Sequence, residues 1–166
     1  MSLDNILLNN EAFQILFAKN LIEDIGKQHV TEILKKPEIK YLGENKKNIL
    51  FLVNDDLHTF TGDAEMEMLT NLVAACKLTL ADIALVNFNN NPVPYIDLNT
   101  HFSPNKILIF GVSGSQLDLP FTIPFFQIQS FNGQIYLLAP PLKEFINNAS
   151  LKGQLWSCLK KLFLNQ

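Results

Sequence analysis

A continuous apolar run, Ile49–Val53, lies between polar residues in the first third of the chain. The run is too short for a stand-alone buried helix and is rich in β-branched and aromatic residues. It therefore predicts a strand that is buried on both faces, as in the centre of a sheet covered by helices. Two further apolar runs, Ile83–Phe88 and Lys106–Gly111, predict a second and a third strand.

The segment between the first two strands has helical spacing of its apolar residues. A helix is predicted from about Asp63 to Lys77, with Asp63 as its N-cap. Its apolar face consists of Met66, Leu69, Val73 and Cys76. Thr79 and Asp82 then have the spacing of a capping pair. Strand, helix and strand together form a βαβ unit, whose crossover should place the two strands parallel.

The second half of the chain predicts a short helix, a hairpin and a final helix. Tyr95–Phe102 predicts the short helix. The dipeptide Asn132-Gly133 is a strong turn signal and predicts a hairpin within Phe125–Gln134, followed by a strand at Gln134–Ala139. After a proline pair and a short helix, the last helix is expected to run from a cap at Ser150 to Leu164.

The first part of the chain predicts a separate region. Residues 2–36 have helical apolar spacing that stops at Pro37, and residues 35–47 are charged, so an exposed connection is expected there. The front region either packs on the sheet or forms an arm that docks on a partner. We therefore expect residues 1–47 to be a helical region and linker, and residues 48–166 to be a three-layer α/β/α domain with a mostly parallel sheet.

Composition and charge narrow the classes of function. Hydrophobic residues make up 48% of the chain and charged residues 17%, as expected for one globular domain. The chain has no arginine, and its net charge is -3. Between Asn48 and Leu142 the only basic residues are Lys77 and Lys106, against eight acidic ones. Nucleic-acid surfaces need clustered cations to neutralise phosphates, so weak or no direct nucleic-acid binding is expected.

The cysteines and the hydropathy indicate a cytoplasmic protein. Cys76 and Cys158 fall among apolar residues of predicted helices, which is typical of structural thiols in a reducing compartment. We expect neither a signal peptide nor a membrane span, because no basic n-region or run of 18 apolar residues occurs. No Gly-rich phosphate loop or nucleophile elbow is present, so no cofactor is expected.

The candidate catalytic residues follow the first predicted strand. This position is at the sheet edge where open α/β folds bind ligands. Asp55 and Asp56 could activate water or hold a metal, but such acids are also common loop residues and helix caps. His58 is the one histidine near them. No metal ligand set is predicted, because no further carboxylate or histidine cluster accompanies the two acids.

Aromatic residues offer a second kind of site. Phe121, Phe125 and Phe126 form a cluster that is either core or an anchor for a protein contact. Trp156 lies in the predicted last helix beside Leu155, where it is expected to cover the sheet.

Two strings resemble the psi subunit of bacterial DNA polymerase III. They are NILFLVNDDLHTFTGDAEMEMLTNLVAACKLTLADIALVNF and LLAPPLKEFINNASLKGQLWSCLKKL. The resemblance covers about residues 48–162, with a poor match in the middle, and residues 1–47 have no counterpart. It implies the fold of the uracil-DNA glycosylases without their chemistry. It also implies protein partners, namely clamp-loader or chi-like subunits.

Traces of the glycosylase superfamily imply a degenerate base pocket. Phe60 lies in Phe60–Ala64, which is similar to the F-x-G-x-A string of some glycosylases, and Asn87 and Gly111 match positions at their strand ends. Leu138–Pro140 occupies the place of their His-Pro-Ser turn, and Val53–Asp56 occupies the place of their water-activating loop. The catalytic motifs are therefore not preserved, and the cysteines that bind an iron–sulfur cluster in some members are absent.

These observations support three functional hypotheses. The favoured one is a non-catalytic adaptor that resembles psi and links clamp-loader components in DNA replication. The alternative is an active or degenerate uracil-DNA glycosylase, in which Asp55 and Asp56 are the catalytic candidates. The third is a flavodoxin-like protein that binds a nucleotide or another small molecule at Asn54–Gly62.

Overall fold

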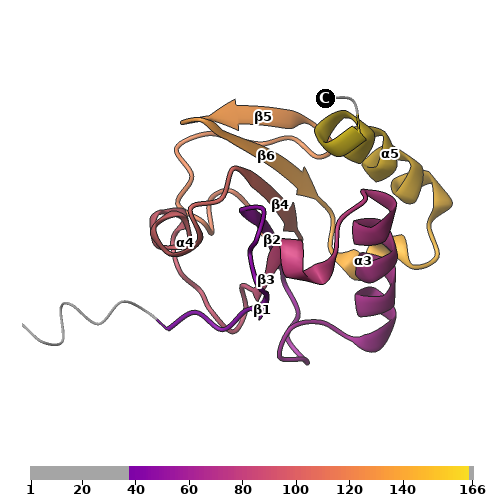
Figure 1. Cartoon of the computed structure of the whole chain (residues 1–166), viewed down its shortest axis with the longest axis horizontal. Coiled ribbons are helices and arrows are strands. Elements are labelled where there is room, and N and C mark those ends of the chain that lie inside the picture. Colours follow the sequence, from indigo (N-terminus) through magenta and orange to yellow (C-terminus); the bar gives the residue numbers. More distant parts are fainter. Residues whose placement is uncertain (1–37, 165–166) are drawn as a thin grey trace, which may run out of the picture. The chain divides into compact units, whose positions relative to one another are not determined.

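The structure of the protein is a computed structural model that describes residues 38–164. These residues fold around a six-stranded mixed sheet (Figure 1). The strands are β1 (Leu42–Gly43), β2 (Ile49–Val53), β3 (Ile83–Asn87), β4 (Lys106–Phe110), β5 (Ile128–Phe131) and β6 (Gln134–Ala139). Their order in the sheet is β1-β3-β2-β4-β6-β5. The four inner strands are parallel, whereas β1 and β5 are antiparallel edge strands. The α/β class is thus confirmed, but the sheet is only partly parallel.

The three predicted apolar strands and the strand at Gln134–Ala139 are the four inner strands. Every residue of β2 and of β3 is buried. Within the sheet, Phe51 of β2 lies opposite Leu85 of β3 and Leu108 of β4. An unbroken apolar run is required here because strands with helices on both faces have no solvent-facing side.

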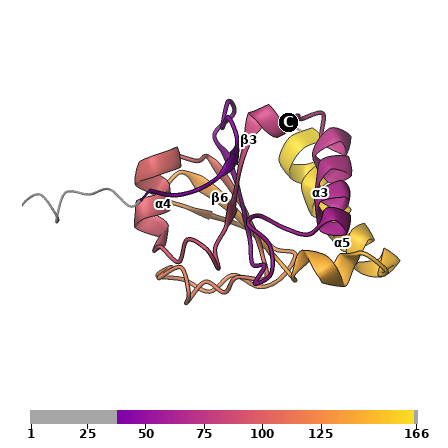
Figure 2. The same ribbon diagram turned by 90° about the horizontal axis from the view of Figure 1, so that it is seen from below.

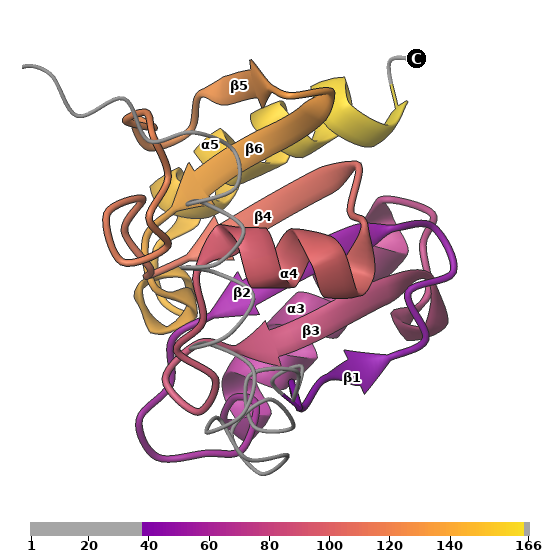
Figure 3. The same ribbon diagram turned by 90° about the vertical axis from the view of Figure 1, so that its left-hand side faces the viewer.

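Helices cover both faces of this sheet (Figures 2 and 3). They are α3 (Asp63–Ala75), α4 (Tyr95–Phe102) and α5 (Ala149–Leu159). Residues of β2 alternate between two cores: Phe51 packs in the core beneath α3 and α5, and Leu50 packs in the core beneath α4. Because successive side chains of the central strands point to opposite faces, both faces of the sheet are apolar and each is covered by helices.

The predicted N-caps of α3 and α5 are displaced from the true caps by one and two residues. Gly62, in an extended conformation, is the N-cap of α3, and Asp63 is the first helical residue. Asn148 rather than Ser150 caps α5, because its side-chain oxygen accepts a hydrogen bond from the Leu151 N–H at 3.1 Å. In both places an acceptable cap residue in the sequence lies just inside the first turn of the helix.

Two local turn predictions are confirmed. Thr79 and Asp82 form a reciprocal capping box around a single 3-10 turn before β3. Asn132 and Gly133 connect β5 to β6 with φ angles of 49° and 75°, the left-handed values that a tight hairpin turn requires. Because a hairpin reverses the chain, β5 must be antiparallel to β6.

The segment that was expected to be an exposed connection belongs partly to the sheet. Ile39 is buried in the core beneath α4, and β1 pairs with β3. A compact unit begins at Ile39. The helical spacing over residues 2–36 lies outside the described residues, so both arrangements of that region stay predictions.

The phenylalanine cluster divides among three environments. Phe121 packs against the ring of Tyr136 in the core beneath α4, with ring centroids 5.3 Å apart. Phe126 packs against Phe145 in the opposite core. Phe125 is 55% exposed and is the member that stays available for a contact.

The buried thiols and the half-buried tryptophan agree with the sequence predictions. Cys76 and Cys158 are free and buried, and burial raises the pKa of Cys76 to about 11. A thiol with that pKa stays protonated and inert at neutral pH. Trp156 packs against the core beneath α3 and α5. Among residues 38–164 we find no helix with the length and apolarity that a bilayer crossing requires.

Gly111 follows β4 directly and has a φ of +72°, which L side chains rarely adopt. A Cβ at this position would also lie 2.9 Å from Cγ of Pro141. Gly111 thus allows the chain that leaves β4 to pass close to the chain that leaves β6.

We expect Gly111→Ala to lower the free energy of unfolding by about 1–3 kcal/mol, because it adds backbone strain and a clash with Pro141. Gly153→Ala is the matched control, since Gly153 is inside α5 with open space around it, and should stabilise by about 0.5–1 kcal/mol. Urea unfolding of both variants measures the difference. Equal effects at the two glycines would contradict this account.

Candidate functional site

The carboxyl ends of β2 and β3 lie side by side, because the two strands are parallel and Val53 pairs with Asn87. The loop of residues 54–62 leaves β2 at this edge, and the asparagine-rich segment of residues 88–91 leaves β3 next to it. Asp55, His58 and Asn87 therefore lie close together at this edge.

Asp55 is the centre of the 54–62 loop. One carboxylate oxygen accepts hydrogen bonds from the backbone N–H groups of Leu57, at 2.9 Å, and His58, at 3.0 Å. The other oxygen accepts from the Gly62 N–H at 3.1 Å and lies 3.0 Å from Nδ1 of His58. The side chain is only 16% exposed. The carboxylate thus closes the loop onto the start of α3.

These contacts also determine the charge state of Asp55. Burial acts to raise the pKa of the carboxyl group. The hydrogen bonds from the Leu57 and His58 N–H groups and from the His58 ring outweigh burial, so the pKa of Asp55 is lowered overall. Asp55 is therefore held as a carboxylate.

Asn87 is fully buried at the end of β3, and its side-chain amide joins the two strand ends. Its Oδ1 accepts hydrogen bonds from the N–H groups of Asp55 and Asn89, each at 3.1 Å. Its Nδ2 donates to the carbonyl oxygens of Asp55, at 2.7 Å, and His58, at 2.9 Å. Both acceptor sites and both hydrogens of the amide are thereby used. The Asn87 amide would have to break these hydrogen bonds before it could form hydrogen bonds with a nucleobase.

The four residues of the expected base pocket do not converge. Phe60 is half-buried and packs against the core beneath α3 and α5. Leu138 is 7% exposed and packs in the core on the other face of the sheet. Gly111 contacts Pro141, and Asn87 is fully buried among loop atoms. The sheet separates Phe60 from Leu138, which linear motif matching cannot detect.

A small cavity of about 140 Å³ does lie at this edge. It is lined by residues 53–58 together with Thr61, Glu65, Pro141, Leu142 and Lys143. Asp55, Asp56 and His58 are therefore at its wall, and Phe60 and Asn87 are not. Within residues 38–164 no group of three or more His, Cys, Asp or Glu side chains could hold a metal ion.

The Asp55–His58 pair is the one arrangement at this edge with catalytic geometry. A carboxylate that contacts one ring nitrogen of a half-exposed histidine can orient the other nitrogen towards a substrate. The same carboxylate, however, is bound by three backbone N–H groups. Its contacts are those of a loop organiser, which is the structural alternative that the sequence left open for Asp55.

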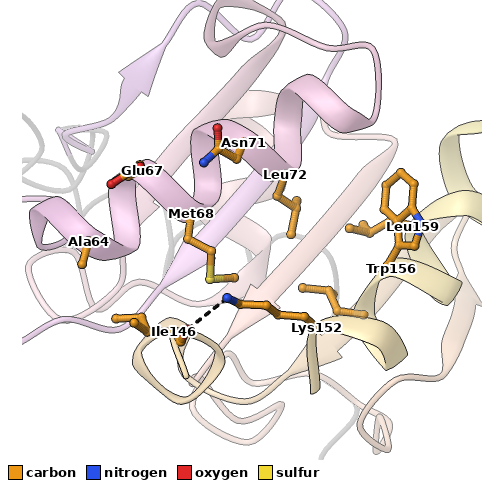
Figure 4. Close-up of a pocket in the computed structure, with 10 residues that line it drawn as sticks. Ala64, Glu67, Met68, Asn71, Leu72, Ile146, Lys152, Trp156 and Leu159 are labelled. Atoms are coloured by element: carbon orange, nitrogen blue, oxygen red, sulfur yellow. Dashed lines mark hydrogen bonds between the residues drawn. The ribbon is translucent and has the colours of Figure 1, made fainter. Parts of the chain in front are cut away.

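A larger hollow, which sequence reasoning missed, lies between α3 and α5 (Figure 4). Its volume is about 410 Å³, and its lining residues are Ala64, Glu67, Met68, Asn71, Leu72, Ile146, Lys152, Leu155, Trp156 and Leu159. We call this hollow the α3–α5 groove. The apolar spacing of each helix indicated a buried face, but nothing in either segment showed that the two faces leave an open channel between them.

Comparison with known proteins adds no family. No protein-family model matches the chain, and no curated protein matches it. The geometry of the sheet edge and of the groove therefore has to indicate the function.

We expect the contribution of Asp55 to stability to depend on pH. Because folding lowers its pKa, the carboxylate stabilises the protein fully above about pH 5, and this contribution is lost as pH falls through the native pKa, below about pH 4. Asp55→Asn should lower the free energy of unfolding by about 1–3 kcal/mol at neutral pH and by much less at about pH 3.

Chemical unfolding at both pH values, together with amide hydrogen exchange at Leu57, His58 and Gly62, measures this effect. Asp56→Asn is the control, because Asp56 is exposed, and it should leave both readouts nearly unchanged. A pH-independent effect of Asp55→Asn would show that the carboxylate charge does not hold the loop.

Asn87→Ala should destabilise the protein by about 3 kcal/mol or more, since it leaves the N–H and C=O groups of Asp55 and the N–H group of Asn89 without their partner. Asn90→Ala is the matched control, because the exposed Asn90 side chain donates to the carbonyl oxygens of His58 and Thr59 in the same loop. Water can replace those bonds, so its cost should stay below about 1 kcal/mol. Thermal or urea unfolding compares the two, and similar costs would refute the role of Asn87.

Proposed function

We propose that this protein is a non-catalytic adaptor, resembling the psi subunit of DNA polymerase III, that links clamp-loader components through protein–protein contacts. The observation that carries the proposal is that the side chains of Asp55 and Asn87 form hydrogen bonds to the 54–62 loop. Together they account for nine hydrogen-bonding contacts within the protein. Side chains with this many internal partners stabilise a fold and have little remaining capacity for a substrate.

The distribution of charge supports the same proposal. An enzyme that flips a nucleotide out of DNA must hold the flanking phosphates with cationic side chains. Of the residues that line the small cavity at the sheet edge, only Lys143 is a lysine, and Asp55, Asp56 and Glu65 are acidic. This balance of charge repels a phosphate backbone.

The apolar surface supports a role in protein binding. The α3–α5 groove exposes parts of Met68, Leu72 and Trp156, and Phe125 is 55% exposed elsewhere. Aromatic residues and methionine are enriched in protein interfaces. The resemblance to psi names the class of partner, namely clamp-loader and chi-like subunits.

The decisive experiment is a binding assay with purified clamp-loader subunits and a chi subunit from the organism that encodes the chain. The immobilised full chain should retain at least one of them at micromolar concentration, and Asp55→Asn should retain it equally, because Asp55 is a loop residue in this proposal. Absence of retention for every subunit would reject the adaptor function.

An activity assay provides the opposite test. Incubation of the chain with uracil-containing single- and double-stranded DNA should release no uracil. Excision that is lost in Asp55→Asn would overturn the proposal in favour of a uracil-DNA glycosylase.

A further inference from the structure

The α3–α5 groove has two apolar walls that come from different parts of the chain. Met68 and Leu72 point from α3 towards the opposite wall, which Ile146, Trp156 and Leu159 form (Figure 4). Met68 and Leu72 are only partly buried, although both pack against the core beneath the two helices. The core therefore continues into the groove and reaches solvent there.

The length of the groove matches two turns of a helix. On α3 the lining extends from Ala64 to Leu72, and on α5 it extends from Lys152 to Leu159. At a rise of 1.5 Å per residue, these spans correspond to about 10–12 Å, or two helical turns. Two turns accommodate three apolar side chains at positions i, i+3 or i+4, and i+7 of a bound helix.

Each wall of the groove carries one charged lining residue, Glu67 on α3 and Lys152 on α5, and the two have opposite sign. The α3 helix contains Asp63, Glu65 and Glu67 and no basic residue, and Glu67 lies in the lining. The segment 149–164 contains three lysines and no acidic residue, and Lys152 lies in the lining. The Lys152 Nζ donates to the Ile146 carbonyl oxygen at 2.9 Å, which fixes the position of this cation (Figure 4).

We infer that the α3–α5 groove binds an amphipathic helix of a partner protein, with a basic flank along α3 and an acidic flank along α5. The inference rests on the proposed adaptor function and assigns the surface through which the adaptor binds. Because the apolar face of the helix must point into the groove, the two charged flanks also select one of the two directions in which the helix can lie.

Synthetic peptides test the charge complementarity directly. We would use three helical peptides of 15 residues with the same apolar stripe: one with a Lys flank and a Glu flank, one with Lys on both flanks and one with Glu on both. Trp156 is the single tryptophan of the chain and lines the groove, so its fluorescence reports binding to the full-length protein.

The mixed-charge peptide should shift the Trp156 emission to the blue and bind about threefold or more tightly than either uniform peptide. Glu67→Lys makes both walls basic and should transfer the preference to the all-Glu peptide. High salt should reduce these differences. Absence of any shift, or equal affinity for the three peptides, would overturn the inference.

A pair of variants on α3 tests the apolar wall. Met68→Glu places a charge inside the groove and should weaken binding of the mixed peptide about tenfold or more. Thr70→Glu adds the same charge at an exposed position of the same helix and should leave binding unchanged. Unfolding curves check that both variants are folded. Equal loss in the two variants would overturn the inference.

The same variants separate this inference from the adaptor function. If a clamp-loader or chi subunit binds the chain and Met68→Glu abolishes retention while Thr70→Glu does not, both proposals are supported. If the subunit binds Met68→Glu as well as the wild type, the adaptor function stands and the groove assignment fails. A blue shift that grows with protein concentration, in the absence of peptide, would assign the groove to a second copy and overturn the inference.

Discussion

The side-chain amide of Asn87 is the interaction on which the functional edge of the protein depends. It connects the end of β3 to the backbone of the loop that leaves β2, through the Asp55 N–H and the carbonyl oxygens of Asp55 and His58. A buried amide of this kind is stable only when all its hydrogen-bonding groups have partners. Asp55 then holds the rest of the loop by accepting from the Leu57, His58 and Gly62 N–H groups.

This constraint determines where the polar groups of Asp55 and Asn87 point at the sheet edge. In open α/β folds the loops after parallel strands bind ligands because their polar groups point into the crevice between them. Here the polar groups of Asp55 and Asn87 are turned back onto the backbone of the 54–62 loop. On the flank of the sheet, apolar residues of α3 and α5, among them Met68 and Trp156, line the α3–α5 groove.

The predicted strands were confirmed because their signal is local and strong. An uninterrupted apolar run such as Ile49–Val53 has no solvent-facing side, so it has to lie in the middle of a covered sheet, and all five of its residues are buried. The Asn132-Gly133 turn was equally dependable, since few dipeptides adopt two consecutive positive φ angles. Helix caps were less certain, because Asn148 and Ser150 are both acceptable caps and only packing decides where the helix begins.

The candidate site shows what linear patterns miss. Its polar residues were found because parallel strands bring their carboxyl ends to one edge, but their roles depended on hydrogen bonds between Asp55 and Asn87, which are 32 residues apart. Phe60 and Leu138 were placed in one pocket by motif matching, whereas they pack on opposite faces of the sheet. The pleat alternates faces from one residue to the next, so a motif match gives no information on side-chain direction unless the register is known.

The sequence by itself determined the α/β class, the inner strands, the hairpin and the burial of both cysteines. Each of these follows from the spacing of apolar residues or from the backbone preference of one or two residues. Tertiary structure alone decided that β1 joins the sheet, that the Asn87 side chain hydrogen-bonds to the 54–62 loop and that α3 and α5 leave a groove between them. Those features depend on contacts between segments far apart in the chain, and no local pattern encodes the distance or direction of such contacts.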